Sequence, residues 1–408
     1  MLVATVLISA LLPLLLPILV WRAGVGRALT SEMRLGLRRR PFRVWRIELG
    51  KSRFAAWLRR WNVDRAALIL HVLRGQMSIV GPRAVAVDEH NLAAAGSRRF
   101  LVKPGLVCLW WIRRRANIAY GSEWAADNEY VATRSHRGDA GIVLRAVVAG
   151  LYGAQPVEIA DGIALFGLPL ANVTMNEAVR RMVGQLDADQ PRRVCFVNAD
   201  CVNLAFRRTD YHRVLETSWM NLADGIGMKI AGRVLGSDIR ENLCGTDLFL
   251  HLCEALAGSD KSVYLLGGKP GVADDLRAWM RERYPKTRVV GARDGYFTAA
   301  DEPHVVADIR ASGADVLLVA FGAPKQDLWV AEHLVATGVK LAMGVGGLFD
   351  YYSGRIPRAP VWVREIGMEW AFRLLQEPKR LWKRYLCGNL VFLARLARWK
   401  IAPPGRNT

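Results

Sequence analysis

From about residue 157 onward, short apolar runs alternate with helical stretches, and this alternation constrains the fold more than any other feature of the sequence. The runs are rich in Val and Leu, which is typical of buried strands. Strands that alternate with helices predict a doubly wound α/β domain with a mainly parallel sheet. Four runs carry this prediction: RRVCFVNA (192–199), SVYLLGG (262–268), ADVLLVAFG (314–322) and KLAMGVGG (340–347).

Glycine-rich turns follow three of these runs. Gly267 and Gly268 end the second run, Gly322 ends the third and Gly346 lies in the fourth. Ligands of such sheets bind beyond the carboxyl ends of the strands, and helix N-termini attract phosphate, so the turns predict a nucleotide diphosphate site. The sequence has neither a GxGxxG fingerprint that opens a helix nor a GxxxxGK[ST] loop, which disfavours dinucleotide oxidoreductases and P-loop ATPases.

Asp224 lies between small residues, before the helical run MKIAGRVLG (228–236). A carboxylate at the edge of a pocket could act as general base on a sugar hydroxyl. From spacing alone, an N-cap or turn aspartate fits equally well. The residue types therefore leave both interpretations of Asp224 open.

The chain is strongly basic, with a formal net charge of +20 and a sequence pI of about 10.2. Such a balance implies an anionic partner, which can be nucleic acid, anionic lipid or a phosphorylated substrate. Fourteen tryptophans favour the membrane, because Trp settles at the headgroup level, and no motif supports nucleic acid. Six cysteines without CxxC or zinc-ligand spacing indicate free thiols in a reducing compartment.

Both ends of the chain carry membrane signals. Residues 2–21 form an apolar run long enough to cross a bilayer, but Pro13 and Pro17 disfavour a straight helix and favour a re-entrant one. Basic residues follow this run, which places that flank in the cytoplasm. Residues 381–400 alternate apolar and basic residues at helical spacing, as in a helix that lies in the bilayer interface.

The first third of the chain is similar to the bacterial sugar transferases, which are polyprenyl-phosphate phosphoglycosyl transferases. The resemblance rests on RRRPFRVWRIE (38–48), on the GxMSxVGPR motif at 75–83 and on RRFLVKPGLVCLWWIRRR (98–115). It implies a small α-rich domain that follows a re-entrant membrane helix.

The catalytic pair of that family is altered here. The resemblance implies an Asp-Glu dyad, in which Asp attacks the sugar phosphate and Glu helps to hold Mg²⁺, and the corresponding residues are Asp64 and Arg65. Arginine cannot replace a carboxylate ligand, because its positive charge is fixed. We therefore expect residues 22–150 to be a degenerate domain kept as a membrane platform. The alternative is an active phosphoglycosyl transferase whose catalytic dyad lies at other positions in the chain. Glu48 is one conceivable substitute carboxylate.

The second half of the chain resembles the WecG/TagA/CpsF family, glycosyltransferase family 26. The resemblance covers more than half of the chain, with many motifs in order. These motifs are GLPLANVTMNEAV (167–179), FVNADCVNLAF (196–206), ADGIGMKIAGRVLG (223–236), CGTDLF (244–249), VYLLGGKPGVA (263–273), DGYF (294–297), VAFGAPKQDLWV (319–330), GVGGLFDYYSG (344–354) and RAPVWVREIGMEWAFRLLQEPKR (358–380).

This resemblance implies an inverting transfer of a sugar from a UDP-sugar to an undecaprenyl-diphosphate-linked sugar, in exopolysaccharide, capsule or cell-wall polymer assembly. It maps the base of the family to Asp224, the donor-site glutamine to Gln326 and an asparagine near the nucleotide to Asn198. Phe196 stands where the family often has threonine, which puts a hydroxyl role there in doubt. The nucleotide-sugar site is also expected to include Gly225, Gly267, Gly268 and Lys325.

Arginines near the C-terminus fall where the family has an appendage that closes over the site. We expect Arg358, Arg364 and Arg373 to bind diphosphate, because guanidinium groups bind it bidentately and can stabilise charge on the UDP leaving group. A solvated basic face is the alternative for any one of them. No cofactor and no metal is expected, since the only DxD, at 187–189, fits a polar loop better than a metal site.

These patterns predict four regions: a membrane helix (1–21), a degenerate sugar-transferase-like domain (22–150), a glycosyltransferase domain (157–354) and a basic appendage (355–400). We expect the protein at the cytoplasmic face of a bacterial inner membrane. Its expected partners are a UDP-sugar, a polyprenyl-diphosphate-linked acceptor and the membrane, with a homo-oligomer left open. Two other functions stay open: a bifunctional enzyme that also transfers sugar 1-phosphate to polyprenyl phosphate, and a non-catalytic membrane scaffold.

Overall fold

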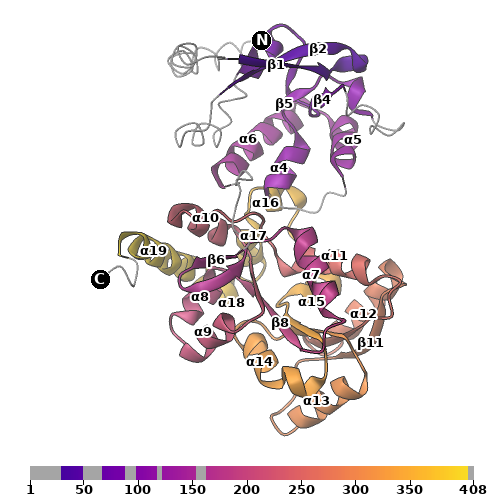
Figure 1. The fold of residues 1–408 in the computed structure, drawn as a ribbon, viewed down its shortest axis with the longest axis vertical. Helices are drawn as coiled ribbons and strands as arrows, with labels where there is room; N and C mark the ends of the chain where they lie inside the picture. Colours follow the sequence, from indigo (N-terminus) through magenta and orange to yellow (C-terminus); the bar gives the residue numbers. More distant parts are fainter. Residues whose placement is uncertain (1–28, 49–66, 88–97, 117–121, 153–161, 403–408) are drawn as a thin grey trace. The chain divides into compact units, whose positions relative to one another are not determined.

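The computed structural model describes residues 29–48, 67–87, 98–116, 122–152 and 162–402 (Figure 1). The chain divides into two compact units, residues 1–155 and 156–408, and each is described by itself. The membrane helix expected at 1–21 and the Asp64-Arg65 pair lie outside the described residues. Within the described residues, every helix is too short or too polar to cross a bilayer.

The second unit is built on a six-stranded sheet in which all neighbouring strands are parallel. The strand order is β11-β10-β12-β13-β8-β9. The parallel α/β fold expected from the alternation of apolar runs and helices is therefore confirmed. The strands are β8 (Arg192–Val197), β9 (Met220–Ala223), β10 (Ser262–Gly267), β11 (Arg288–Arg293), β12 (Val316–Ala320) and β13 (Leu341–Gly344).

Helices connect these strands and cover both faces of the sheet (Figure 1). They are α7 (Met175–Gln185), α8 (Ala199–Ala205), α9 (Thr209–Glu216), α10 (Ile226–Leu235), α11 (Gly245–Leu256), α12 (Val272–Arg283), α13 (Glu302–Ala311), α14 (Lys325–Thr337) and α15 (Leu348–Tyr352). Leu265 and Met343 pack with α7, α11 and α12, whereas their neighbours Leu266 and Ala342 pack with α13 and α14. Because both faces are buried, the strands are continuous apolar runs in the sequence.

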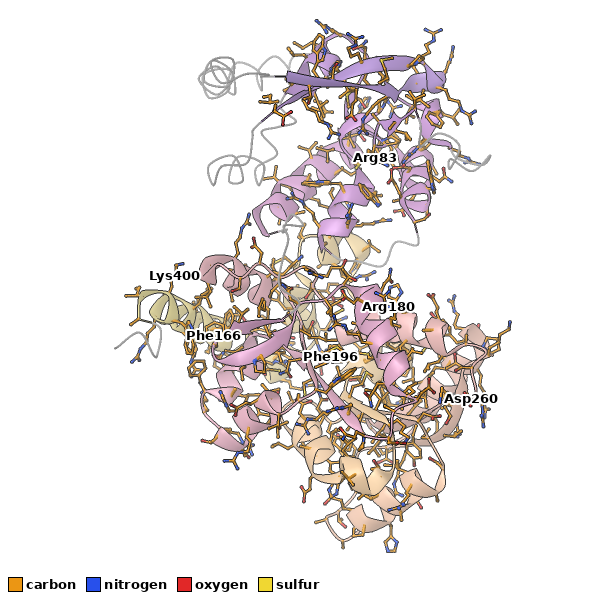
Figure 2. All side chains as sticks on the ribbon, in the orientation of Figure 1. Arg83, Phe166, Arg180, Phe196, Asp260 and Lys400 are labelled. Atoms are coloured by element: carbon orange, nitrogen blue, oxygen red, sulfur yellow. The ribbon has the colours of Figure 1, made fainter. Side chains whose placement is uncertain are left out.

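A short hairpin and a C-terminal segment, defined here as residues 355–402, complete the second unit. The hairpin pairs β6 (Gly162–Leu165) with β7 (Leu168–Ala171), and Phe166 at its turn contacts the ring of Trp399 (Figure 2). Phe392 and Leu396 of the segment are buried against α8. The segment comprises α16 (Val361–Glu365), α17 (Glu369–Gln376), α18 (Pro378–Trp382), the π-helical turn η5 (Lys383–Cys387) and α19 (Gly388–Ile401).

The first unit mixes strands with helices, so its expected description as α-rich is corrected. Residues 41–47 largely alternate exposed and buried side chains, which is the period of a strand, and they pair with residues 29–35 as an antiparallel hairpin. The strands are β1 (Leu29–Leu35), β2 (Pro41–Ile47), β3 (Ser78–Val80), β4 (Val85–Ala86) and β5 (Gly105–Val107). The helices are η1 (Leu37–Arg39), α3 (Ile69–Leu73), η4 (Arg98–Leu101), α4 (Leu109–Ala116), α5 (Glu123–Thr133) and α6 (His136–Tyr152).

The GxMSxVGPR motif forms β3 and the turn that follows it. A Cβ on Gly81 would lie only 2.8 Å from the backbone nitrogen of Gly105, so glycine is required for this contact between the β3 turn and β5. Nε of Arg83, labelled in Figure 2, donates to Glu123 at 2.9 Å. Glu123 also accepts from Arg99, whose guanidinium pairs with the buried Asp127. The motif therefore supports a tight backbone contact and an ion-pair network.

Candidate active site

The order of strands in the sheet departs from their order in the chain between β13 and β8, and three strand ends lie close together there. β13 lies beside β8, so the turns after β13, β8 and β9 are neighbours at the carboxyl edge of the sheet. The backbone N–H of Asp224, just after β9, donates to the carbonyl of Val197 in β8 at 2.9 Å. Ligands of open α/β sheets bind at such places. Asn198, Asp224 and the Gly346-Gly347 turn are therefore the first candidates for substrate contact.

Asn198 caps helix α8, and this cap fixes the direction of its side chain. Its Oδ1 accepts hydrogen bonds from the backbone N–H groups of Asp200 and Cys201, both at 3.1 Å. Asparagine is favoured at this helix position because its short side chain reaches those groups. Since the cap uses the oxygen, the amide N–H₂ is the group that donates to the carboxyl of Asp224. The start of α8 thus brings Asn198 and Asp224 together.

Asp224 is a carboxyl group whose pKa is raised at the edge of the sheet. Burial, and after it the negative charge of Glu369, raise the pKa of Asp224 to about 6. The hydrogen bond from Asn198 and the positive charge of Arg384 oppose this shift. The side chain is only half-buried. A partly exposed carboxylate with a pKa close to the operating pH suits a general base.

The interpretation of Asp224 as an N-cap is wrong. The N-cap of α10 is Gly225, which has a φ of +89° and whose N–H donates to Oδ1 of Asn242. Among the described residues, a Cβ added to Gly225 would meet no atom within 4 Å. The glycine therefore serves the backbone turn and leaves space beside Asp224.

Gly267 and Gly268 lie at another part of the same edge. Gly267 ends β10 and Gly268 follows it, and β12 and β13 separate this strand from β8. A Cβ on Gly267 would lie 2.7 Å from the backbone of Ala320, and the N–H of Gly268 donates to the carbonyl of Ala320 at 3.1 Å. The close approach of two strand ends therefore explains Gly267, whereas Gly268 has a φ of +74° and a Cβ there would lie 2.9 Å from the side chain of Val272. A contact between them and a nucleotide stays a prediction.

Gln326 ties two turns of the carboxyl edge together. Its Oε1 accepts from the N–H of Gly322, after β12, at 3.1 Å and from the N–H of Gly346, after β13, at 2.9 Å. The next residue, Asp327, accepts from the buried hydroxyl of Tyr211 at 2.9 Å. Gln326 is buried, so the structure places it beneath the turns that border the site.

Lys325 begins helix α14 and is exposed beside those turns. Its ammonium group lies 5.0 Å from the centre of the Phe321 ring. Asp327, two residues further along, is buried, and burial raises its pKa to about 6 against the hydrogen bond from Tyr211 and the positive charge of Arg193. An exposed cation beside the glycine turns is compatible with contact to a phosphorylated ligand, and that contact stays a prediction.

Arg358 and Arg364 are directed at a carboxylate of helix α11. Nη1 and Nη2 of Arg358 donate to the two oxygens of Asp247 at 2.7 and 3.0 Å, and its Nε donates to Glu369 at 3.0 Å. Arg364 lies 3.8 Å from the same Asp247. Burial raises the pKa of Asp247, but Arg358, the thiol of Cys244 and Arg364 together outweigh burial, so the pKa is lowered. These two arginines therefore attach the C-terminal segment to the body of the unit.

Arg373 reaches the turn after β13. Its guanidinium lies over the ring of Tyr351, 5.2 Å from the ring centre, and its Nη1 donates to the Tyr351 hydroxyl at 3.2 Å. The same group fills the space beside Gly347, where an added Cβ would lie 2.6 Å from Nη1. Of the three expected arginines, Arg373 is thus the one that lies directly on a glycine turn of the carboxyl edge.

Replacing Gly347 with alanine is expected to displace Arg373. Gly347 has a φ of −80°, which alanine adopts without strain, so the added methyl group acts through its clash with the guanidinium. If Arg373 contributes to the reaction, displacement by about 1 Å lowers turnover by up to about 10²-fold. Steady-state kinetics measure this, and melting temperature reports on folding. In the Arg373→Ala background, the same change should cost almost nothing more; an equal loss in both backgrounds would contradict the role of Arg373.

Sequence reasoning missed three charged residues around Asp224, namely Asp247, Glu369 and Arg384. The first two lie inside quoted motifs, CGTDLF and GMEW, but no local signal indicates that they meet. Arg384 comes from the basic stretch at 381–400 and lies 3.0 Å from Asp200 in α8. Phe196, labelled in Figure 2, packs on Gly245 at the start of α11, where an added Cβ would lie 3.3 Å from its ring.

The acidic residues of the DxD stretch do not join this site. Asp187 is exposed and pairs with Lys261 at 2.8 Å. In the part of the chain that the structure describes, no three His, Cys, Asp or Glu side chains gather as a metal site. The cysteines of the described residues are all free thiols.

Comparison with known proteins gives two family matches and a curated relative. Residues 163–406 match the sequence profile of the Glycosyl transferase WecG/TagA/CpsF family, and residues 50–153 match that of the Bacterial sugar transferase family. The N-acetylglucosaminyldiphosphoundecaprenol N-acetyl-beta-D-mannosaminyltransferase of Bacillus subtilis (strain 168) is 31% identical over 190 residues. The aligned part is 47% of this chain and 73% of that protein.

Proposed function

Because the chain belongs to the WecG/TagA/CpsF family of glycosyl transferases, we propose that its second unit moves a sugar from a UDP-sugar to an undecaprenyl-diphosphate-linked sugar. The product is a longer lipid-linked saccharide for a bacterial surface polymer. The observation that carries the proposal is the place of Asp224: it directly follows β9 at the carboxyl edge of the sheet, its N–H is bonded to Val197 at the end of β8, and its side chain is only half-buried.

The reaction follows from the groups around this carboxylate. Asp224 removes the proton from the acceptor hydroxyl, and the oxygen attacks the anomeric carbon of the donor sugar. The bond from that carbon to the UDP oxygen breaks, and UDP leaves with the electron pair, so the configuration is inverted. Arg373 supplies positive charge where the leaving diphosphate gains negative charge. In this scheme Arg373, rather than a divalent metal, stabilises the charge of the leaving diphosphate. We therefore propose that transfer does not require a metal.

The relative suggests the two sugars. Its name describes transfer of N-acetyl-β-D-mannosamine to N-acetylglucosaminyl-diphosphoundecaprenol. We propose N-acetylmannosamine as the donor sugar here and N-acetylglucosamine as the acceptor sugar. Phe196, whose ring packs on Gly245, stands where the family often has threonine. UDP-glucose and UDP-linked uronic acids should therefore be tested as donors alongside UDP-N-acetylmannosamine.

The C-terminal segment supports a place at the membrane. Leu390 and Ile401 of α19 are 69% and 83% exposed, and the basic residues Arg398 of α19 and Lys383 of the adjoining η5 lie on the same helical stretch. Apolar and basic side chains on one helical segment bind the interface of anionic bilayers. We propose that this segment touches the cytoplasmic face of the inner membrane, where the lipid-linked acceptor is found.

One assay of the full chain tests this function. The chain in detergent or vesicles is given each UDP-sugar with N-acetylglucosaminyl-diphosphoundecaprenol, and the nucleotide product and the lipid product are identified. Release of UDP with a lipid carrying two sugars supports the proposal. Donor that stays intact with every acceptor favours the scaffold instead.

The same assay addresses the first unit, whose family match favours a second candidate function. With polyprenyl phosphate as acceptor, a phosphoglycosyl transferase releases UMP, whereas a glycosyl transferase releases UDP. We propose that residues 22–150 are a platform without this chemistry, because Arg65 replaces the expected metal-binding carboxylate. Release of UMP that depends on Asp64 would establish the bifunctional alternative.

A further inference from the structure

The C-terminal segment carries a second carboxylate to the neighbourhood of Asp224. Glu369 is the first residue of α17, and its Oε1 accepts from Nε of Arg358 at 3.0 Å. The two other guanidinium nitrogens of Arg358 hold Asp247 of α11. Asp247 also accepts from the thiol of Cys244 at 3.0 Å. Arg358 thus links Glu369 of the C-terminal segment to Asp247 of α11.

The backbone of Gly367 packs closely on the side chain of Ile226, near the ion pairs of Arg358. Gly367 has a φ of +71°, and a Cβ added there would lie 2.6 Å from Cδ1 of Ile226. Gly367 comes two residues before Glu369, and Ile226 comes two residues after Asp224. The contact therefore places the residues just before α17 against the start of α10, and each carboxylate lies two residues along the chain from it.

Several charged or polar groups face Asp224 from the elements that surround it. Asn198 donates from the N-cap of α8, Arg384 contributes positive charge from η5, and Asp247 contributes negative charge from α11. Glu369 on α17 has the largest effect on the pKa of Asp224 among these neighbours, and it raises that pKa. The base of the proposed reaction thus depends most strongly on a residue that belongs to the C-terminal segment.

We propose that Glu369 is a positioning residue, which Arg358 holds beside Asp224 so that its negative charge makes Asp224 a stronger proton acceptor when the C-terminal segment is docked. The inference rests on the proposed role of Asp224 as base. When Asp224 takes the proton from the acceptor hydroxyl, the repulsion between the two carboxylates disappears, and this favours proton transfer. Docking of the segment and activation of the base are then one event.

Replacement of Glu369 by glutamine in the full chain tests this directly. The readout is the pH dependence of kcat/KM for UDP release, from about pH 5 to 8, which reports the pKa of the base in the free enzyme. In the native chain Asp224 is ionised above about pH 6, so activity falls as the pH drops below that value. Removing the negative charge lowers the pKa of Asp224, so the acid limb should move down by about half to one pH unit.

Two further variants separate charge from structure. Glu369→Asp keeps the negative charge and should return the acid limb toward its native position. Glu254→Gln removes an exposed carboxylate of α11 and should leave the whole profile unchanged. Melting temperatures confirm that each variant folds, and Glu369→Ala provides a second neutral side chain if the amide is not tolerated.

Each result decides the inference. A shifted acid limb in the neutral variants with restoration by aspartate supports it. An unshifted limb in a folded, active neutral variant overturns it, and so does complete loss of transfer at every pH in a folded variant, because a change in the pKa of Asp224 alone cannot produce that loss. If the native chain transfers no sugar to any acceptor, the proposed function fails, and that failure is visible before any variant is made.

Discussion

Replacing Asp224 with asparagine is expected to lower the turnover of sugar transfer by about 10²–10⁴-fold, the range that general-base catalysis contributes. The amide cannot accept a proton from the acceptor hydroxyl. Its oxygen can still accept the hydrogen bond from Asn198, so the local structure should persist. The measurement is UDP release at saturating donor and acceptor, together with the affinity for UDP by calorimetry, which should stay near the native value.

A matched control for this change is Asp260→Asn. Asp260, labelled in Figure 2, is exposed and lies just before β10, at the amino edge of the sheet, opposite the site. The control should keep native kinetics. Native activity in the Asp224 variant would remove this residue from the reaction, whereas a joint loss of activity and UDP binding would point to a structural role.

The second large effect is expected from Arg373→Ala, which should lower turnover by about 10²–10³-fold, the usual loss when one preorganised charge partner of a transition state is removed. The guanidinium lies on the Gly347 turn and against Tyr351, so it is held in place before the diphosphate arrives. Because the negative charge on UDP grows as the sugar leaves, turnover should fall more than the affinity for UDP.

Arg373→Lys should recover only part of the loss, since lysine supplies the charge without the planar pair of donors. Arg180→Ala is the control, because Arg180 is an exposed residue of α7 (Figure 2) and should be dispensable. If Arg373→Ala changes the melting temperature but leaves turnover intact, the arginine is a structural contact of the C-terminal segment. If Arg373→Ala and Arg180→Ala lower turnover equally, the loss reflects the total positive charge of the chain and not the position of Arg373.

Much of the fold could be predicted because the physical signals are local. Strands of a sheet buried on both faces appear as continuous apolar runs, and residues such as Leu265 and Leu266 pack on opposite faces without any polar position between them. The mixed first unit was harder to predict, because β3, β4 and β5 are very short and the longer hairpin at 29–47 lies in a basic stretch. Along residues 41–47 the alternation of exposed and buried side chains, rather than the overall composition, indicates the strand.

The site could be predicted only in part. Asn198 follows an expected strand, but the strand before Asp224, β9, was not among the expected runs, so the structure is what shows the ends of β8 and β9 to be neighbours. Gln326 was expected at the donor, but the structure buries it beneath two turns, because its oxygen is needed by the N–H groups of Gly322 and Gly346. A glutamine beside a glycine turn looks the same in sequence whether it serves a ligand or the backbone.

The sequence by itself determined the alternation of strands and helices, the glycine turns at the carboxyl edge and the isolated aspartate among small residues, since each depends on neighbours along the chain. Only the tertiary structure decided what the C-terminal arginines do. Arg358 lies 111 residues from Asp247 in sequence, yet the two form a bidentate ion pair, whereas Arg373 lies on the Gly347 turn. Charge can be counted in a sequence, but the partner that neutralises it is set by the folding of distant segments onto one another.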